Sequence, residues 1–252
     1  MQAKKSLGQH FLINLNVAHN IISLIEKNYR VLEIGPGRGA LTELLLNKSF
    51  NVDAVEFDSD MIEYLQNKFT GKRNLNIIQS DASVYALDKK YCVVGNLPYN
   101  ISKKIIVNMI KQKQFIDKMI FMVQKEVANT MIAKLNTKEY SKFSIFVQMF
   151  CNVKKVFDVK PEAFWPAPKV ISSVILLEPY EKSLLNIEID KTFFDFLTIF
   201  FSQPNKTVRN NLKKYIKLEN LNENLILNAR PRQVSIQEIY KFFNYLKERT
   251  WV

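Results

Sequence analysis

Short apolar runs and amphipathic stretches alternate along the first two thirds of the chain. Runs rich in β-branched and other apolar residues predict strands at 30–34, 51–56, 75–78, 91–95 and 118–123. Apolar positions at helical spacing between them predict helices at about 17–26, 40–48, 59–68, 102–111 and 125–134. This alternation is typical of βαβ units and a mainly parallel sheet. A helix near 144–150 and a final strand pair, 151–160 and 170–178, follow.

From Pro179 onward the pattern predicts helices only, and the polar stretch 180–186 marks a domain boundary. We therefore expect an α/β domain at residues 1–180 and a small all-helical domain at residues 181–252. Residues 192–202 carry five phenylalanines at helical spacing, which is typical of a hydrophobic core rather than of a surface that stacks bases.

A basic stripe follows in the helical domain. Its members recur at spacings of 3, 4 and 4 and would share one helical face: Lys206, Arg209, Lys213 and Lys217. Val208, Leu212, Tyr215 and Ile216 form a second stripe that could pack inward. A solvated face is the ordinary meaning of such a stripe, and contact with a nucleic-acid backbone is the alternative.

The segment Gly95–Asn100 lies just beyond the predicted strand 91–95, and its sequence is Gly-Asn-Leu-Pro-Tyr-Asn. Ligands collect beyond the carboxyl ends of strands in open α/β sheets. Pro98 restricts the backbone, so that the Asn96 side-chain oxygen and the Leu97 carbonyl can point to one place. Two acceptors beside the Tyr99 ring suit a planar amino group such as N6 of adenine. A surface turn is the alternative for this motif taken alone.

A glycine-rich turn and two acids follow neighbouring predicted strands. The turn Gly35–Gly39 has the spacing G-x-G-x-G, which differs from the G-x-G-x-x-G that cradles a pyrophosphate. Glu56 ends the second strand, 17 residues after Gly39, close to the spacing at which an acid meets ribose hydroxyls. Asp81 follows the third strand. Each acid alone could be solvated, but their convergence predicts a ligand site.

Together these segments resemble the small-subunit rRNA adenine-N6 dimethyltransferase family. The resemblance covers at least residues 4–178, and its motifs are Lys5–Leu12, Glu33–Gly37, Glu56, Asp81, Asn96–Tyr99, Phe164–Val170 with Ser172–Val174, and the tail Arg230–Ser235. His10 departs from the family, in which many members carry Asn. The resemblance to this family implies a Rossmann-like methyltransferase domain, with the terminal strand pair antiparallel, followed by the helical domain.

The resemblance also implies S-adenosyl-L-methionine as the cofactor. Glu56 would bind its ribose hydroxyls and Asp81 its adenine, while the turn at Gly35 and Gly37 would admit its methionine part. His10 would bind its carboxylate. Leu12, Ala82 and Asn96 complete the expected cofactor site. The expected catalytic set is Asn96, Leu97, Pro98, Tyr99 and Phe164, where Tyr99 and Phe164 would sandwich a target base that has left its stack.

Composition agrees with this interpretation. The net charge is +12 over 252 residues, which favours a polyanionic partner. We expect this partner to be small-subunit rRNA or the assembling small subunit. No apolar run is long enough for a membrane span, and residues 1–5 lack the apolar core of a signal peptide. Cys92 and Cys151 sit in apolar surroundings, so we expect two reduced, buried thiols in a cytoplasmic, monomeric protein without metal.

Three other functions remain open at this point. The chain could be a large-subunit rRNA adenine-N6 methyltransferase of the macrolide-resistance type, although residues 95–102 and 164–170 look more like the small-subunit enzyme. It could be a ribosome-assembly or transcription factor that kept the fold without catalysis. An NAD-dependent dehydrogenase is the weakest alternative, because of the glycine spacing.

Overall fold

The computed structural model describes residues 4, 8–26, 29–181, 191–215 and 225–248. The chain divides into two compact units. Unit 1 consists of Met1–Ala128 and Cys151–Glu181, and unit 2 consists of Asn129–Phe150 and Lys182–Val252. The division differs from the predicted one mainly at residues 129–150, which the sequence pattern placed in the α/β domain and which group with the C-terminal helices. The later boundary lies after residue 181, one residue beyond its predicted place.

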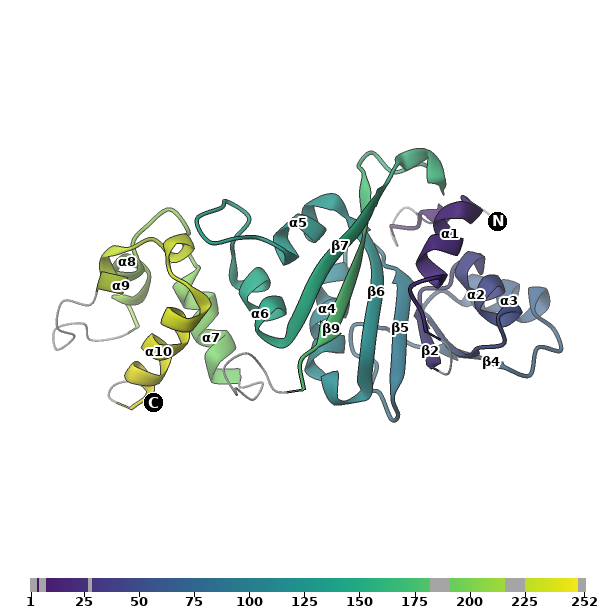
Figure 1. Cartoon of the computed structure of the whole chain (residues 1–252), viewed down its shortest axis with the longest axis horizontal. Helices are drawn as coiled ribbons and strands as arrows, with labels where there is room; N and C mark the ends of the chain where they lie inside the picture. Colours follow the sequence, from purple (N-terminus) through teal and green to yellow (C-terminus); the bar gives the residue numbers. More distant parts are fainter. Residues whose placement is uncertain (1–3, 5–7, 27–28, 182–190, 216–224, 249–252) are drawn as a thin grey trace. The chain divides into compact units, whose positions relative to one another are not determined.

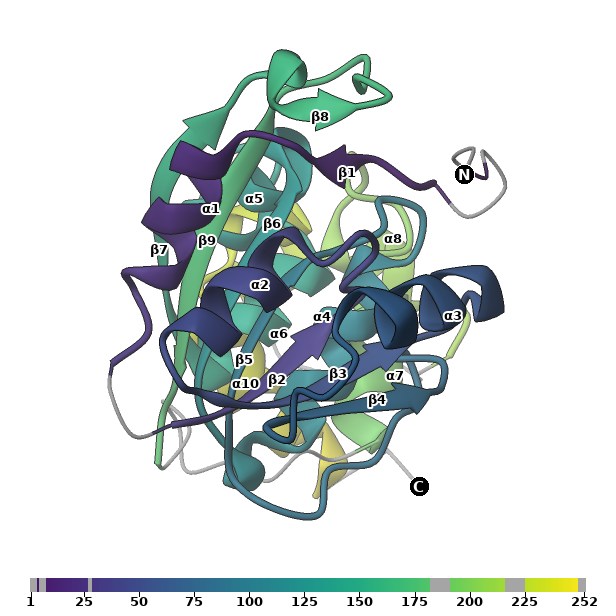
Figure 2. The ribbon, with the colours of Figure 1, turned by 90° about the vertical axis from the view of Figure 1, so that its right-hand side faces the viewer.

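A seven-stranded sheet forms the centre of unit 1 (Figures 1 and 2), in the order β4-β3-β2-β5-β6-β9-β7. Its strands are β2 (Arg30–Ile34), β3 (Asn51–Glu56), β4 (Leu75–Gln79), β5 (Tyr91–Asn96), β6 (Ile116–Gln124), β7 (Cys151–Val159) and β9 (Ser172–Pro179). The first five are parallel, while β9 runs antiparallel to both β6 and β7. The expected parallel sheet with a terminal antiparallel pair is therefore confirmed.

Three helices connect parallel strands: α2 (Ala40–Asn47), α3 (Ser59–Lys68) and α4 (Ser102–Lys111), the last followed by the 3₁₀ turn η2 (Lys113–Phe115). Helix α1 (Leu15–Ile22) precedes β2, and α5 (Lys125–Met131) follows β6 and crosses the division between the units. Leu41, Leu45 and Leu65 of α2 and α3 pack with Ile21 and Ile22 of α1 and with alternate strand residues in one hydrophobic core. Right-handed crossovers place α4 on the opposite face of the sheet, because its connection runs in the other direction.

Helix α1 begins two residues earlier than the pattern predicted and ends at Ile22 instead of residue 26. The Asn14 side chain accepts a hydrogen bond from Val17 N at 3.1 Å and so starts the helix. Helix α5 likewise ends at Met131, three residues before its predicted end. Cys92 and Cys151 are both buried and free, as expected.

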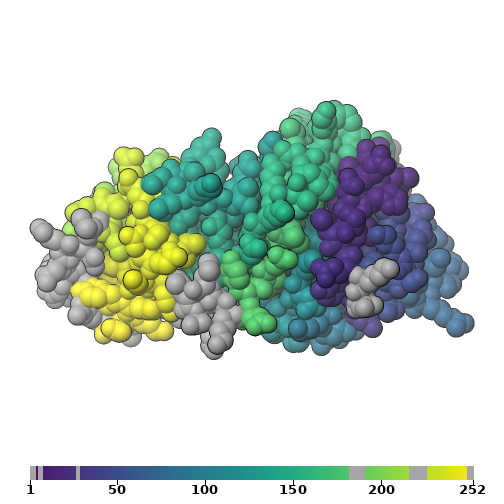
Figure 3. Space-filling model, viewed as in Figure 1, coloured from purple at the N-terminus to yellow at the C-terminus, as the bar shows by residue number. Residues whose placement is uncertain are grey.

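A second, two-stranded sheet joins segments that lie far apart in the chain. Strand β1 (Phe11–Leu12) pairs antiparallel with β8 (Phe164–Trp165), and the 3₁₀ turn η3 (Pro161–Ala163) precedes β8. Ile13 N and Asn14 N both donate to Ala163 O, at 2.9 and 3.2 Å. Figure 3 shows the resulting N-terminal segment, in purple, lying between the blue α2–α3 region and the green 151–180 region.

Unit 2 is helical. Its further elements are α6 (Lys142–Phe150), α7 (Lys191–Phe200), α8 (Val208–Leu212), α9 (Leu225–Asn228), the 3₁₀ turn η4 (Pro231–Gln233) and α10 (Ile236–Lys247). Phe193 and Phe196 of α7 lie 5.0 and 5.3 Å from the Phe243 ring of α10. The prediction that the phenylalanines of α7 form a core is therefore confirmed. Among the described residues, no helix is long and apolar enough to cross a membrane.

The predicted basic helix is shorter than expected. Thr207 caps α8 by accepting a hydrogen bond from Asn210 N, so Lys206 precedes the helix rather than lying within it. Arg209 lies in α8, Lys213 follows it as the C-cap, and Lys217 lies outside the described residues. The prediction that the four cations share one helix is thus wrong at Lys206. Lys206, Arg209 and Lys213 are nevertheless all exposed. Val208 and Leu212 pack inward as predicted, whereas Tyr215 is 61% exposed.

Candidate active site

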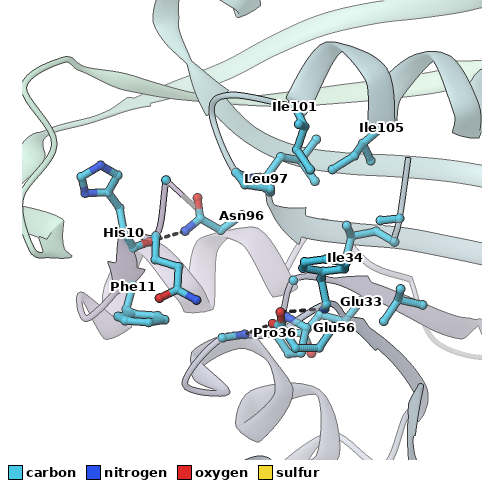
Figure 4. Close-up of a pocket in the computed structure, with 18 of the residues that line it drawn as sticks. His10, Phe11, Glu33, Ile34, Pro36, Glu56, Asn96, Leu97, Ile101 and Ile105 are labelled. Carbon is cyan, nitrogen blue, oxygen red and sulfur yellow. Dashed lines mark hydrogen bonds between the residues drawn. The ribbon is translucent and has the colours of Figure 1, made fainter. Parts of the chain in front are cut away.

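The carboxyl ends of β4, β3, β2 and β5 meet at one edge of the sheet, because these strands are parallel neighbours. A cavity of about 310 Å³ lies at this edge. Residues at the ends of these strands line it together with the N-terminal segment: Gly8–Leu12, Glu33–Arg38, Glu56, Asp81–Ala82 and Asn96–Ile101. Figure 4 shows His10, Glu56 and Asn96 among them. The cavity volume lies at the lower end of the range found for small-molecule binding sites.

The glycine-rich turn forms the floor of the cavity next to β2. Gly35, Gly37 and Gly39 all have positive φ, at 64°, 54° and 78°. A Cβ at Gly37 would meet the Phe11 ring at 3.0 Å, and one at Gly39 would meet the Phe69 ring at 2.7 Å. Glycine is therefore required both by the backbone conformation and by the space, and the bare backbone allows a ligand to approach closely.

Glu56 presents its carboxylate to the cavity and is only 8% exposed. Its Oε1 accepts from Phe57 N at 2.8 Å and Asp58 N at 3.0 Å, and its Oε2 accepts from Gly37 N at 3.2 Å. Burial raises the pKa of Glu56, while these backbone donors oppose the rise. A carboxylate fixed in this way has lone pairs left to accept hydrogen bonds from ligand hydroxyls.

Asp81 and Ala82 follow β4 at the same edge of the sheet. Asp81 Oδ1 accepts from Ser83 N at 2.8 Å, which fixes the carboxylate. Ala82 is buried, and its carbonyl accepts from Asn108 Nδ2 at 3.1 Å. His10 and Leu12 also line the cavity. The structure thus brings together all the residues predicted to hold the cofactor.

The side-chain oxygen of Asn96 is buried and has no partner in the part of the chain that the structure describes. Its Nδ2 donates to the His10 carbonyl oxygen at 2.8 Å, and this carbonyl can only accept, so the amide nitrogen must face it. Oδ1 is left buried without a hydrogen-bond partner among the described residues, in a residue that lines the cavity. An unpaired buried acceptor costs free energy, which a ligand that donates a hydrogen bond would recover.

The residues after Asn96 are held from several sides. Leu97 N donates to Met122 O at 3.0 Å, and the Leu97 side chain is 1% exposed. Pro98 lines the cavity, and its carbonyl accepts from Ile101 N at 3.2 Å. The Tyr99 hydroxyl lies 2.6 Å from Ser172 Oγ, and burial raises the Tyr99 pKa. The backbone that carries the Leu97 carbonyl is therefore fixed before a ligand enters.

Phe164 does not join Tyr99 at the cavity. Its ring is 3% exposed and belongs to the hydrophobic core of unit 1, and it is not among the cavity-lining residues. Its neighbour Trp165 is 43% exposed instead. The reason is the β1–β8 pairing, which turns alternate side chains to opposite faces and sends Phe164 inward. The predicted contact of Phe164 with a target base would require this ring to leave the core.

Glu33 is a cavity residue to which sequence reasoning gave no role. It is 1% exposed, and its Oε2 accepts from Thr42 Oγ1 at 2.6 Å. Burial raises its pKa from 4.5 to about 7, and the nearby Glu56 charge adds to the rise. The sequence could have indicated a role for Glu33 by its position, because it lies one residue before the end of the strand that leads into the glycine-rich turn.

These features fit S-adenosyl-L-methionine and an adenine. The Glu56 carboxylate suits the two hydroxyls of a ribose, and Asn96 Oδ1 suits an amino group. The bare backbone of the glycine-rich turn suits the methionine part of the cofactor, which must approach it closely. The fit rests on the unpaired buried Asn96 Oδ1 and on the bare backbone of Gly35 and Gly37, which lines the cavity.

Comparison with known proteins agrees with this geometry. The model of the ribosomal RNA adenine dimethylase family matches residues 1–248. The ribosomal RNA small subunit methyltransferase A of Mycoplasma mobile is 39% identical over 250 residues, which cover 96% of this chain and 97% of that protein. A dimethyladenosine transferase structure from Plasmodium falciparum has a TM-score of 0.80 at 27% identity, covering 96% of this chain and 100% of that one.

A 23S rRNA methyltransferase structure shares the fold, with a TM-score of 0.67 at 20% identity over 93% of this chain and 99% of that one. This likeness extends the fold match to nearly the whole chain but says nothing about the substrate. The match of the family model over residues 1–248 and the 39% identity carry the assignment instead. The chain belongs to the ribosomal RNA adenine dimethylase family.

Proposed function

We propose that this protein transfers methyl groups from S-adenosyl-L-methionine to N6 of adenosines, two adjacent ones, in small-subunit rRNA. The buried, unpaired Asn96 Oδ1 at the cavity is the observation that carries the proposal, because it calls for a hydrogen-bond donor such as an exocyclic amino group. Family membership supports the reaction, and relatives named for the small subunit favour this substrate over large-subunit rRNA.

The chain's contribution is orientation of the nucleophile. N6 of adenine is a poor nucleophile because its lone pair is delocalised into the ring. Acceptance of its two hydrogens by Asn96 Oδ1 and the Leu97 carbonyl favours a pyramidal nitrogen, with the lone pair directed at the methyl donor. The bound cofactor supplies that methyl on a sulfonium. The methylated nitrogen is positively charged and acidic and then loses one proton to water, so no general base is required before transfer.

The remaining residues bind and orient. We assign the ribose hydroxyls to Glu56, the cofactor's adenine to Asp81 and Ala82, and its methionine part to the backbone at Gly35 and Gly37 with Leu12. Tyr99 offers a face to the target base, and stacking on an aromatic ring is worth about 1–3 kcal/mol per base. Pro98 fixes the turn between Leu97 and Tyr99.

The partners follow from the substrate. We propose that the protein acts as a monomer in the cytoplasm, on the assembling small subunit or its rRNA, without a metal ion. A net charge of +12 suits such a polyanionic partner.

The direct test offers purified protein the small-subunit rRNA or the large-subunit rRNA, each with S-adenosyl-L-methionine, and maps N6,N6-dimethyladenosine. We expect the modification in small-subunit rRNA only. Methylation of large-subunit rRNA alone would show that the protein is a large-subunit rRNA methyltransferase. Absence of methylation on both RNAs and on assembled subunits would favour a binding protein.

Glu56→Ala should weaken binding of S-adenosyl-L-methionine, since it removes charge-assisted hydrogen bonds worth about 1.5–3 kcal/mol. Calorimetric titration of the cofactor measures the change directly. Glu43→Ala is the matched control, because Glu43 is an exposed glutamate on α2. An unchanged dissociation constant for Glu56→Ala would reduce Glu56 to a strand-end acid.

Arg209 and Lys213 are the described cations of the basic stripe that lie in or next to α8. If they contact rRNA phosphates, changing both to Gln should flatten the dependence of log affinity on log salt by about 0.7–0.9 per lost contact. Affinity for the RNA across a salt series is the measurement. The control variant changes Lys72 and Arg73 to Gln, because they are two exposed cations of unit 1. Parallel lines for wild type and the Arg209/Lys213 variant would place the stripe in solvent.

A further inference from the structure

The His10 ring contacts Tyr99 rather than one of the groups expected to bind the cofactor. The two rings stack with centroids 5.3 Å apart and planes inclined by 28°. His10 Nδ1 also lies 2.6 Å from the Pro166 carbonyl oxygen. Since a carbonyl can only accept, Nδ1 carries the proton and donates it to this bond. The orientation of the imidazole is thereby fixed against the segment between β8 and β9.

Tyr99 is in turn held at two points. His10 covers its ring, and Ser172 Oγ lies 2.6 Å from its hydroxyl. Ser172 is fully buried at the start of β9, so the hydroxyl end of the ring has a rigid support. A ring held at its hydroxyl alone could still turn about its long axis, and the stacked imidazole restricts this rotation.

We propose that His10 is a positioning residue: it sets the plane of the Tyr99 ring against which the target adenine stacks. This inference rests on the proposed function and deepens it. The contribution of His10 separates into two parts. Its backbone carbonyl orients the Asn96 amide and does not depend on the side chain. Its imidazole orients Tyr99 and does depend on it.

This role differs from binding the cofactor's carboxylate, and the two make opposite predictions. A positioning residue for Tyr99 affects methyl transfer when the cofactor is saturating and leaves cofactor affinity nearly unchanged. A carboxylate ligand weakens cofactor binding and leaves transfer at saturation nearly unchanged.

The test compares His10→Asn, which removes the ring, with His10→Phe, which keeps a ring but removes the Nδ1 donor. Single-turnover methyl transfer to small-subunit rRNA is measured at saturating cofactor, beside calorimetric titration of the cofactor. We expect His10→Asn to slow transfer about threefold to tenfold, the range that the loss of an aromatic pair implies. His10→Phe should restore most of the rate. Cofactor affinity should change less than about twofold in both variants.

Two controls sharpen the result. His19→Asn changes the other histidine of the chain, which is exposed on α1, and should leave transfer unchanged. The second is a double-mutant cycle with Tyr99→Leu, which keeps an apolar side chain but no ring. If His10 acts through Tyr99, His10→Asn should add less than about a twofold loss in the Tyr99→Leu background.

Independent losses in the cycle, or weaker cofactor binding with normal transfer at saturation, would overturn this inference while the proposed function stands. A wild-type protein that methylates no rRNA would overturn the proposed function, and this inference with it.

Discussion

Asn96→Ala is expected to slow methyl transfer by about 10²–10³-fold, the typical cost of losing one group aimed at the reacting centre. The variant removes the only buried side-chain oxygen of the cavity that the described protein leaves without a partner. The interaction should strengthen as N6 becomes pyramidal, so the loss appears in the rate of the chemical step rather than in binding. Single-turnover methylation of small-subunit rRNA measures it.

Affinity of the Asn96→Ala variant for S-adenosyl-L-methionine should change much less than its rate. Asn152→Ala is the matched control, since Asn152 is an exposed asparagine on the edge strand β7. Transfer at the wild-type rate by Asn96→Ala would contradict the assigned role of the amide oxygen.

Glu33→Gln is expected to raise the free energy of unfolding at neutral and alkaline pH. Below about pH 4.5 the Glu33 carboxyl is neutral in both the folded and the unfolded chain. As the pH rises from 4.5 to about 7 the unfolded chain loses this proton first, so the wild-type protein loses stability over that interval. Above about pH 7 the raised pKa of Glu33 lowers the free energy of unfolding of the wild-type protein by about 3 kcal/mol.

The amide of the Glu33→Gln variant stays neutral at every pH and escapes this loss. Calorimetric unfolding across the pH range measures the difference between variant and wild type, which should grow from pH 4.5 to about 7 and then level off. Glu43→Gln, on the exposed face of α2, should show no such growth. A difference for Glu33→Gln that is constant with pH would mean that burial does not raise the pKa of this carboxyl.

Local pattern was enough to predict the sheet and most of the site. β3 and helices α3 and α4 have the predicted bounds, because β3 is a short buried run and the helices carry apolar residues at helical spacing. Asp58 also caps α3. Glu56, Asp81 and Asn96 follow strands whose ends must meet in a parallel sheet. Their convergence around one cavity therefore follows from strand order alone.

Long-range contacts determined what the pattern missed. Phe164 turns into the core because β8 pairs with β1, more than 150 residues earlier in the chain. The grouping of residues 129–150 with the C-terminal helices depends on packing that no local signal carries. The start of α8 at Val208, later than predicted, is different, since the Thr207 before it is a recognisable N-cap that the pattern of charges obscured.

Strand order also has a consequence for synthesis. β9 is inserted between β6 and β7, and β1 is paired with β8, so the N-terminal segment has no partner strand until residue 165 has been made. The nascent chain thus presents β6 as an open edge while the ribosome still holds residues 172–179. The N-terminal segment that lines the cavity therefore gains its strand partner only after most of unit 1 has emerged. A chain truncated before residue 172 should aggregate through the exposed β6 edge rather than persist as a smaller methyltransferase.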